Sequence, residues 1–134
     1  RSTKEIHERL KTRQYTSKAI KEILAYLLEA RFLDDMKFTD EWIRWRLNNG
    51  YGRHRISFEL KQKGIDEKMI KEGLSKAFCD YDEEKAALAL AQKRAKRYHQ
   101  LEPAVIQRRL YGYLLRKGFS QNISLKIVHQ YDNI

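Results

Sequence analysis

The sequence of 134 residues has one cysteine, one proline and six glycines. The single cysteine, Cys79, cannot form an internal disulfide, which fits a reducing cytoplasm. So few glycines and prolines argue against a turn-rich β-fold. The longest apolar run, Ile23 to Leu28, is far shorter than the ~20 residues that a helix needs to span a bilayer. We therefore expect a cytoplasmic protein without a membrane segment.

Residues that could form a catalytic or metal site are scattered. One cysteine cannot build a zinc site, and no glycine-rich phosphate loop is present. Asp34-Asp35 is a carboxylate pair that we assign to a turn rather than to metal binding. The four histidines lack ligand spacing: His7, His54, His99 and His129. We therefore expect no enzyme activity, no cofactor and no metal. The chain opens with Arg1 rather than Met, which allows it to be part of a longer protein.

Basic residues are abundant and unevenly placed. The net charge is +10, from 28 basic and 18 acidic residues. Residues 93–117 hold eight basic residues and one acid, and residues 44–63 hold six basic residues and one acid. An excess of this size favours an anionic partner, which could be nucleic acid, an acidic protein face or a membrane surface.

One pattern occurs three times along the chain. In each copy two apolar positions four apart precede a short turn, one large apolar residue, a helix N-cap residue and two further apolar positions. The turns read Arg13-Gln14-Tyr15-Thr16, Lys63-Gly64-Ile65-Asp66 and Lys117-Gly118-Phe119-Ser120. Because no segment shows the alternation of a strand, we predict an all-α protein of tandem three-helix, helix-turn-helix-like repeats. Repeats of this length commonly stack into elongated surfaces for large partners.

Capping and breaking residues predict where the helices lie. We expect eight: seven near residues 2–12, 16–31, 39–48, 53–63, 66–78, 82–98 and 103–117, and an eighth that begins at Ser120. A capping box at Ser2–Glu5 begins the first, Leu33-Asp34-Asp35 forms a turn, and Thr39 begins the third. The predicted repeats are residues 1–36, 37–80 and 81–134. The first of them lacks its leading helix.

The basic clusters give the candidate binding residues. In a DNA-binding helix-turn-helix the second helix meets the bases, but Asp66 and Glu67 stand there, so readout of a base sequence is disfavoured. The candidates for contact with a partner or DNA are Arg44, Arg46, Tyr51, Arg53, His54, Arg55, Lys61, Lys63, Lys93, Arg94, Lys96, Arg97, Arg108, Arg109, Arg116 and Lys117. Tyr51 could instead pack between repeats. Trp42 and Trp45 are assigned to packing, with partner contact as the alternative.

Four stretches match, in order and spacing, the pattern of a known family. They are Leu33-Asp34-Asp35 with Phe38, Trp42 and Arg46; Gly50-Tyr51-Gly52 with Arg55-Ile56 and Glu59-Leu60; Lys63-Gly64-Ile65-Asp66; and Arg116-Lys117-Gly118-Phe119-Ser120. On these residues the chain resembles the RecX family, bacterial regulatory proteins of the RecA recombinase. The resemblance runs from Ser2 to about Tyr131, and it departs at Gln14, where the family pattern often has Gly.

The resemblance implies a curved, elongated protein of tandem three-helix repeats without catalytic residues. It implies binding along the groove of the RecA–DNA filament, where the protein restrains ATP hydrolysis, strand exchange and filament growth. Basic faces would add weak contact with single- or double-stranded DNA, and we expect a monomer. Two alternatives come from other classes. The chain could be a general nucleic-acid-binding helical module, or a protein scaffold whose charge only maintains solubility.

Overall fold

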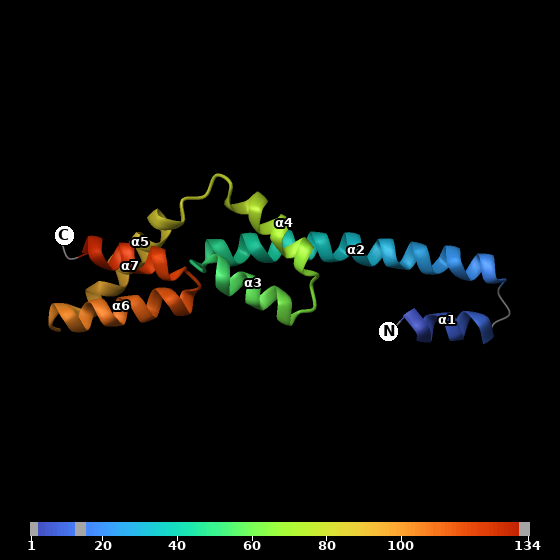
Figure 1. Cartoon of the computed structure of the whole chain (residues 1–134), viewed down its shortest axis with the longest axis horizontal. Coiled ribbons are helices and arrows are strands. Elements are labelled where there is room, and N and C mark those ends of the chain that lie inside the picture. The colour runs from blue at the N-terminus through green and yellow to red at the C-terminus, as the bar shows by residue number, and fades with distance from the viewer. Residues whose placement is uncertain (1–2, 13–15, 132–134) are drawn as a thin grey trace. The chain divides into compact units, whose positions relative to one another are not determined.

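A computed structural model describes residues 3–12 and 16–131, and every element in these ranges is helical (Figure 1). The chain divides into two units, Arg1–Phe38 and Thr39–Ile134. Each unit is considered by itself below. The prediction of an all-α fold is confirmed, while the predicted repeat boundaries at 36/37 and 80/81 stay predictions.

The first unit contains α1 (Thr3–Thr12) and the beginning of α2 (Ser17–Asn48). These two segments run antiparallel (Figure 1), and Ile20 is buried. The hydroxyl of Thr16 accepts a hydrogen bond of 3.1 Å from the backbone N–H of Ala19, so the predicted cap of α2 is confirmed. The predicted capping serine, Ser2, and the turn residues Arg13, Gln14 and Tyr15 lie outside the described residues.

The predicted turn at Leu33-Asp34-Asp35 is wrong, because α2 continues without interruption from Ser17 to Asn48. Residues 17–48 contain neither Gly nor Pro, and Asp in a helix interior costs at most about 0.7 kcal/mol relative to Ala. Thr39 is not an N-cap either. Its side chain is buried against α4, where it lines the space beside Gly73.

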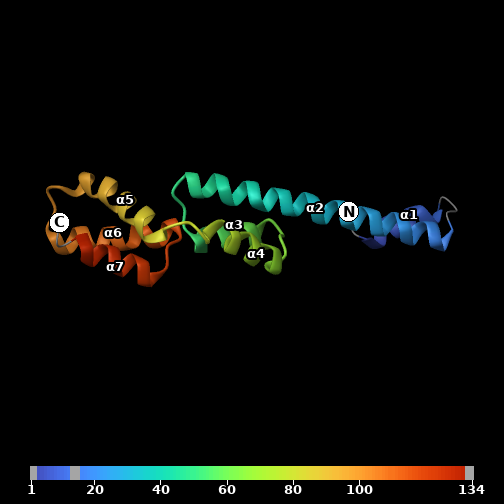
Figure 2. The same ribbon diagram turned by 90° about the horizontal axis from the view of Figure 1, so that it is seen from above.

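The last turns of α2 pack with α3 (Arg53–Gln62) and α4 (Glu67–Phe78) to form the second repeat (Figure 2). Gly64 ends α3 with φ +82°, and the N–H of Ile65 donates to the carbonyl of Leu60 over 3.1 Å. Asp66 occupies the N-cap position of α4 as predicted, although its side chain makes no capping hydrogen bond. The core residues are Ile43, Ile56, Leu60, Ile65, Met69, Ile70, Leu74 and Phe78.

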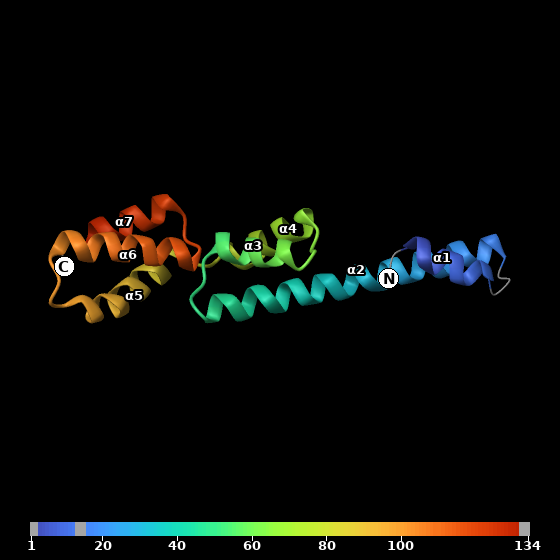
Figure 3. The ribbon, with the colours of Figure 1, turned by 90° about the horizontal axis from the view of Figure 1, so that it is seen from below.

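The third repeat comprises α5 (Glu83–Ala95), the 3-10 helix η1 (Lys96–Tyr98), α6 (Pro103–Lys117) and α7 (Gln121–Tyr131) (Figure 3). The predicted caps are present: the Asp82 carboxylate accepts from the N–H of Lys85 over 3.0 Å, and the Ser120 hydroxyl accepts from the N–H of Ile123 over 3.1 Å. Small side chains on α5 let α7 approach closely. The core residues are Ala87, Ala91, Ala95, Tyr98, Ile106, Leu110, Leu114, Phe119, Ile127 and Val128.

Two glycines join the second and third repeats where the start of α3 meets the end of α6 (Figure 3). The N–H of Gly52 donates to the carbonyl of Lys117 over 2.7 Å, and the N–H of His54 donates to the carbonyl of Gly118 over 3.0 Å. A Cβ on Gly52 would lie 2.6 Å from the carbonyl carbon of Gly118, and a Cβ on Gly118 would collide with Arg55. We call this contact the glycine junction.

Candidate functional site

Cations and aromatic rings alternate in contact along α2 and α3 in the second repeat. The Arg46 guanidinium lies 3.6 Å from the ring centroid of Tyr51, and that of Arg55 lies 5.2 Å from it. Arg46 also lies 5.7 Å from the Trp42 ring, over which the Lys63 ammonium lies at 4.4 Å. A cation over an aromatic face gains about 0.5–1 kcal/mol at an exposed site, so each ring holds its cations in place.

Glu59 fixes the arginines of this cluster. Its carboxylate accepts from Arg46 Nε at 2.8 Å and Nη2 at 2.5 Å, and from Trp42 Nε1 at 3.2 Å and Arg55 Nε at 3.3 Å. Burial acts to raise the pKa of Glu59, but the hydrogen bonds and charge of Arg46, aided by Arg55 and Trp42, hold that pKa below its ordinary value. Because the Arg46 side chain is only 13% exposed and doubly bonded, Arg46 is a structural centre of the cluster rather than a free cation.

The same alternation continues through the third repeat. The Lys117 ammonium lies 4.1 Å from the Tyr51 ring and 5.9 Å from the Tyr113 ring, so it belongs to both halves. The Arg94 guanidinium lies 4.7 Å from the Tyr113 ring, and its Nε donates to the Tyr98 hydroxyl over 3.2 Å. Arg109 lies 5.6 Å from the Tyr98 ring.

We call this continuous series of contacts the cation–aromatic ladder. Its members are Lys63, Trp42, Arg46, Arg55, Tyr51, Lys117, Tyr113, Arg94, Tyr98 and Arg109. It crosses from the second repeat to the third beside the glycine junction, where Arg55 Nη1 also donates to the carbonyl of Arg116 over 3.1 Å.

The ladder is suited to binding a chain of negative charges. Its cations are held by rings and hydrogen bonds, so less side-chain entropy is lost when a partner arrives. Its aromatic faces are largely covered by the chain's own cations, which favours contact with phosphates or carboxylates over stacking with bases. Trp45 lies beside the ladder: the Arg46 guanidinium is 5.4 Å from its ring centroid, it packs edge-on against Trp42 with centroids 5.1 Å apart, and it is 53% exposed.

The structure brings seven of the predicted candidates into the ladder: Arg46, Tyr51, Arg55, Lys63, Arg94, Arg109 and Lys117. Arg53 is instead directed to Glu83, at 2.9 Å, and to the Phe78 ring, at 4.5 Å. The remaining candidates have exposed side chains outside the ladder's contacts: Arg44, His54, Lys61, Lys93, Lys96, Arg97, Arg108 and Arg116.

Four ladder or anchoring residues were not among the predicted candidates: Trp42, Glu59, Tyr98 and Tyr113. A signal for them exists in the sequence. Within helices, residues four apart are neighbours, and this spacing relates Trp42 to Arg46 and Tyr113 to Lys117. The assignment of Trp42 and Trp45 to packing stands for Trp42, which contacts the core of the second repeat, whereas Trp45 is open to solvent.

Two further features of the described residues concern metals and membranes. Nowhere in the described part of the chain do three or more His, Cys, Asp or Glu side chains gather as metal ligands would. None of the described helices combines the length and apolar character that crossing a bilayer requires.

The fold and the ladder define a class, which is an all-α protein of tandem three-helix repeats with a cationic surface. Two family models match this chain: "RecX, second three-helix domain" over residues 34–74 and "RecX, third three-helix domain" over residues 82–128. The chain belongs to the RecX family.

Individual relatives agree with this assignment. Regulatory protein RecX of Bacillus licheniformis is 36% identical over 124 residues, which cover 92% of this chain and 47% of the relative. Regulatory protein RecX of Mycolicibacterium smegmatis is 31% identical over 137 residues, which cover 96% of this chain and 70% of the relative. The crystal structure of RecX from Lactobacillus salivarius matches with a TM-score of 0.71 and 27% identity, covering 100% of this chain and 87% of that one. The chain thus spans about half the length of its Bacillus relative.

Proposed function

We propose that this chain regulates the RecA recombinase, mainly as a negative modulator. It binds along the RecA–DNA filament and restrains ATP hydrolysis, strand exchange and filament growth, within homologous recombination, DNA repair and the SOS response. It acts from the cytoplasm as a monomer and catalyses no reaction of its own. Membership of the RecX family supports this proposal, and the cation–aromatic ladder is the observation that carries it.

The ladder suggests how binding would work. Its cations span two repeats that the glycine junction fixes relative to each other, so several anionic contacts form without rearrangement. Joined contacts of this kind bind more tightly than any one contact alone, because the later ones form at high effective concentration. Phosphate contacts position a protein on nucleic acid without reading its sequence, which suits a regulator that acts anywhere along a filament.

A comparison of two ligands tests the proposal. Fluorescence anisotropy of the labelled chain would be measured against RecA assembled on oligo(dT) with a non-hydrolysable ATP analogue, and against oligo(dT) alone, at the same salt concentration. Tighter binding to the filament than to the bare strand supports the proposal. Equal affinity for both would contradict it.

A general nucleic-acid-binding module is the second candidate, and the net charge of +10 together with the ladder favours it. This function predicts tight binding to bare DNA at physiological salt with no gain from RecA. It also predicts a steep fall of affinity with salt, because neutralised phosphates release their counterions. In contrast, a scaffold whose charge serves only solubility would not bind bare DNA even at low salt.

A further inference from the structure

A hollow lies between α2 and α4 in the second repeat, on the other side of α2 from the ladder. It has a volume of about 280 Å³, and it is lined by Asp40, Ile43, Arg44, Leu47, Gly73, Lys76 and Ala77. Along a helix, positions i, i+3, i+4 and i+7 share one face. Asp40, Ile43, Arg44 and Leu47 follow that spacing, and the ladder residues Trp42 and Arg46 belong to the opposite side.

Gly73 lets α4 approach α2 closely, and its lack of a side chain leaves space in the hollow. Gly in a helix interior costs about 1 kcal/mol relative to Ala. A Cβ on Gly73 would nevertheless lie 3.0 Å from Ile43 Cδ1 and 3.2 Å from Thr39 Cγ2, so Ala would crowd the helix contact. The turns Lys63-Gly64 and Lys117-Gly118 are 54 residues apart, so the position equivalent to Gly73 in the third repeat is Ile127. The Ile127 side chain is buried in the core of that repeat. The two repeats therefore differ at this position.

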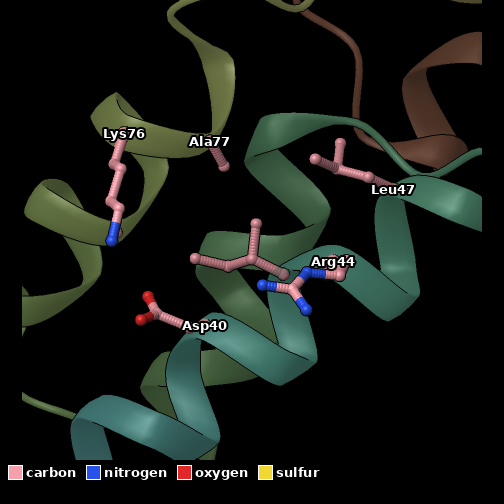
Figure 4. Close-up of a pocket in the computed structure, with 7 residues that line it drawn as sticks. Asp40, Arg44, Leu47, Lys76 and Ala77 are labelled. Carbon is pink, nitrogen blue, oxygen red and sulfur yellow. The ribbon is translucent and has the colours of Figure 1, made fainter.

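The lining combines an apolar floor with a charged rim (Figure 4). Ile43, Leu47 and Ala77 supply the floor. In Figure 4 the charged ends of Asp40, Arg44 and Lys76 point toward the space between the two helices. None of these three side chains has a hydrogen-bond or ion-pair partner among the described residues. The two exposed cations exceed the single carboxylate, so the rim favours an anionic neighbour.

We infer that this hollow receives an apolar side chain of the protein partner, with carboxylates beside it. The inference rests on the proposed function, and it separates protein contact from nucleic-acid contact on the two sides of α2. The volume lies below the ~300–1,000 Å³ of pockets that hold drug-sized ligands, which suits one inserted side chain better than a cofactor. A large side chain seated in a desolvated pocket, surrounded by contacts that exclude water, is a common form of interface hot spot.

Two substitutions on α4 test the inference, each with a matched control on the same helix. Lys76→Glu reverses a rim charge, and Lys71→Glu makes the same change at an exposed position outside the lining. Ala77→Leu fills the hollow, and Ser75→Leu adds the same side chain outside it. Circular dichroism and thermal unfolding first select variants that fold like the wild type.

Binding to the RecA filament and to bare oligo(dT) would then be measured for each variant. We expect Lys76→Glu and Ala77→Leu to weaken filament binding at least about fivefold relative to their controls. Lys76→Glu and Lys71→Glu should bind bare DNA equally. Filament binding by both test variants at the level of their controls would overturn the inference, while leaving the proposed function intact.

Two other results would also decide the matter. A wild-type chain that does not prefer the filament would overturn the proposed function, and the inference with it. Analytical ultracentrifugation could also show that the wild-type chain self-associates. If Ala77→Leu abolished that self-association and Ser75→Leu preserved it, the occupant of the hollow would be a second copy of this chain, and the inference would be overturned.

Discussion

Replacing Gly52 by Ala should break the glycine junction and lower the stability of the unit Thr39–Ile134. The backbone of Gly52, with φ −90° and ψ 171°, is one that Ala adopts freely, so the effect is steric rather than conformational. The added Cβ would lie 2.6 Å from the carbonyl carbon and oxygen of Gly118 and 2.7 Å from the nitrogen of Phe119. All three are backbone atoms, which cannot rotate away as a side chain could.

The cost has two parts. Overpacking against a rigid neighbour costs about 1–3 kcal/mol. Separating the repeats loses the two backbone hydrogen bonds that Gly52 and His54 donate across the junction, each worth about 0.5–1.5 kcal/mol. The sum is on the order of 2–6 kcal/mol, reduced by up to ~1 kcal/mol because Ala restricts the unfolded chain.

Gly64→Ala is the matched control for this substitution. Gly64 has φ +82°, and a Cβ added to it would have nothing within 4 Å, so its replacement costs only the left-handed backbone strain of about 1–2 kcal/mol. The free energy of unfolding would be obtained from urea denaturation followed by circular dichroism at 222 nm. A Gly52→Ala variant that loses no more stability than Gly64→Ala would refute the close-packed junction.

Three further predictions concern the ladder, its anchor Glu59 and the basic residues of α6. Glu59→Gln should lower the free energy of unfolding by about 1–2 kcal/mol at pH 7, because it weakens the charge-assisted hydrogen bonds to Arg46. The control is Glu84→Gln, which removes an exposed ion pair with Lys126 and should change stability by less than about 1 kcal/mol. The folded pKa of Glu59 lies below its ordinary value of 4.5. The extra stability of the wild type over Glu59→Gln is therefore complete above pH 4.5 and is lost as the pH falls through the folded pKa. Urea denaturation at pH 3 and pH 7 checks this, and a stability difference at pH 3 as large as that at pH 7 would contradict it. Tyr51→Phe should preserve both stability and filament binding, because the cations contact the ring and not the hydroxyl. Tyr51→Ala should lower the free energy of unfolding by about 2–4 kcal/mol in a denaturant assay. Equal stability of the two variants would count against the ladder. A variant of α6 replaces four basic residues by Gln: Arg108, Arg109, Arg116 and Lys117. In anisotropy titrations it should bind the filament more weakly and with a shallower salt dependence. An unchanged affinity and an unchanged salt slope would exclude these residues as a binding face.

Local sequence signals predicted the ends of most helices well. Thr16, Asp82 and Ser120 accept the backbone hydrogen bonds expected of N-caps, and Gly118 ends α6 with φ +103°. Pro103 stands in the first turn of α6. Each of these features depends only on residues within one turn of the chain, so no tertiary information was needed.

The errors arose where tertiary packing decides. Asp34-Asp35 suggested a turn, but without Gly or Pro the helix continues, and Thr39 is buried by α4 rather than capping a helix. The ladder likewise depends on Lys117 reaching Tyr51 across the glycine junction, at residues 66 positions apart in the sequence. Spacing within helices predicts pairs such as Tyr113 and Lys117, whereas the connection between repeats follows only from the fold.

RecA's ATP hydrolysis on single-stranded DNA, followed as this chain is added, tests the proposed function most directly. The rate would be measured at saturating ATP, from well below one chain per RecA up to an equimolar ratio. The Gly52→Ala variant, in which we expect the two halves of the ladder to separate at the glycine junction, would be measured in the same way. We expect the rate to fall at substoichiometric ratios with the wild type, and to fall less with Gly52→Ala. A rate that stays constant up to equimolar wild-type chain would contradict regulation of the filament.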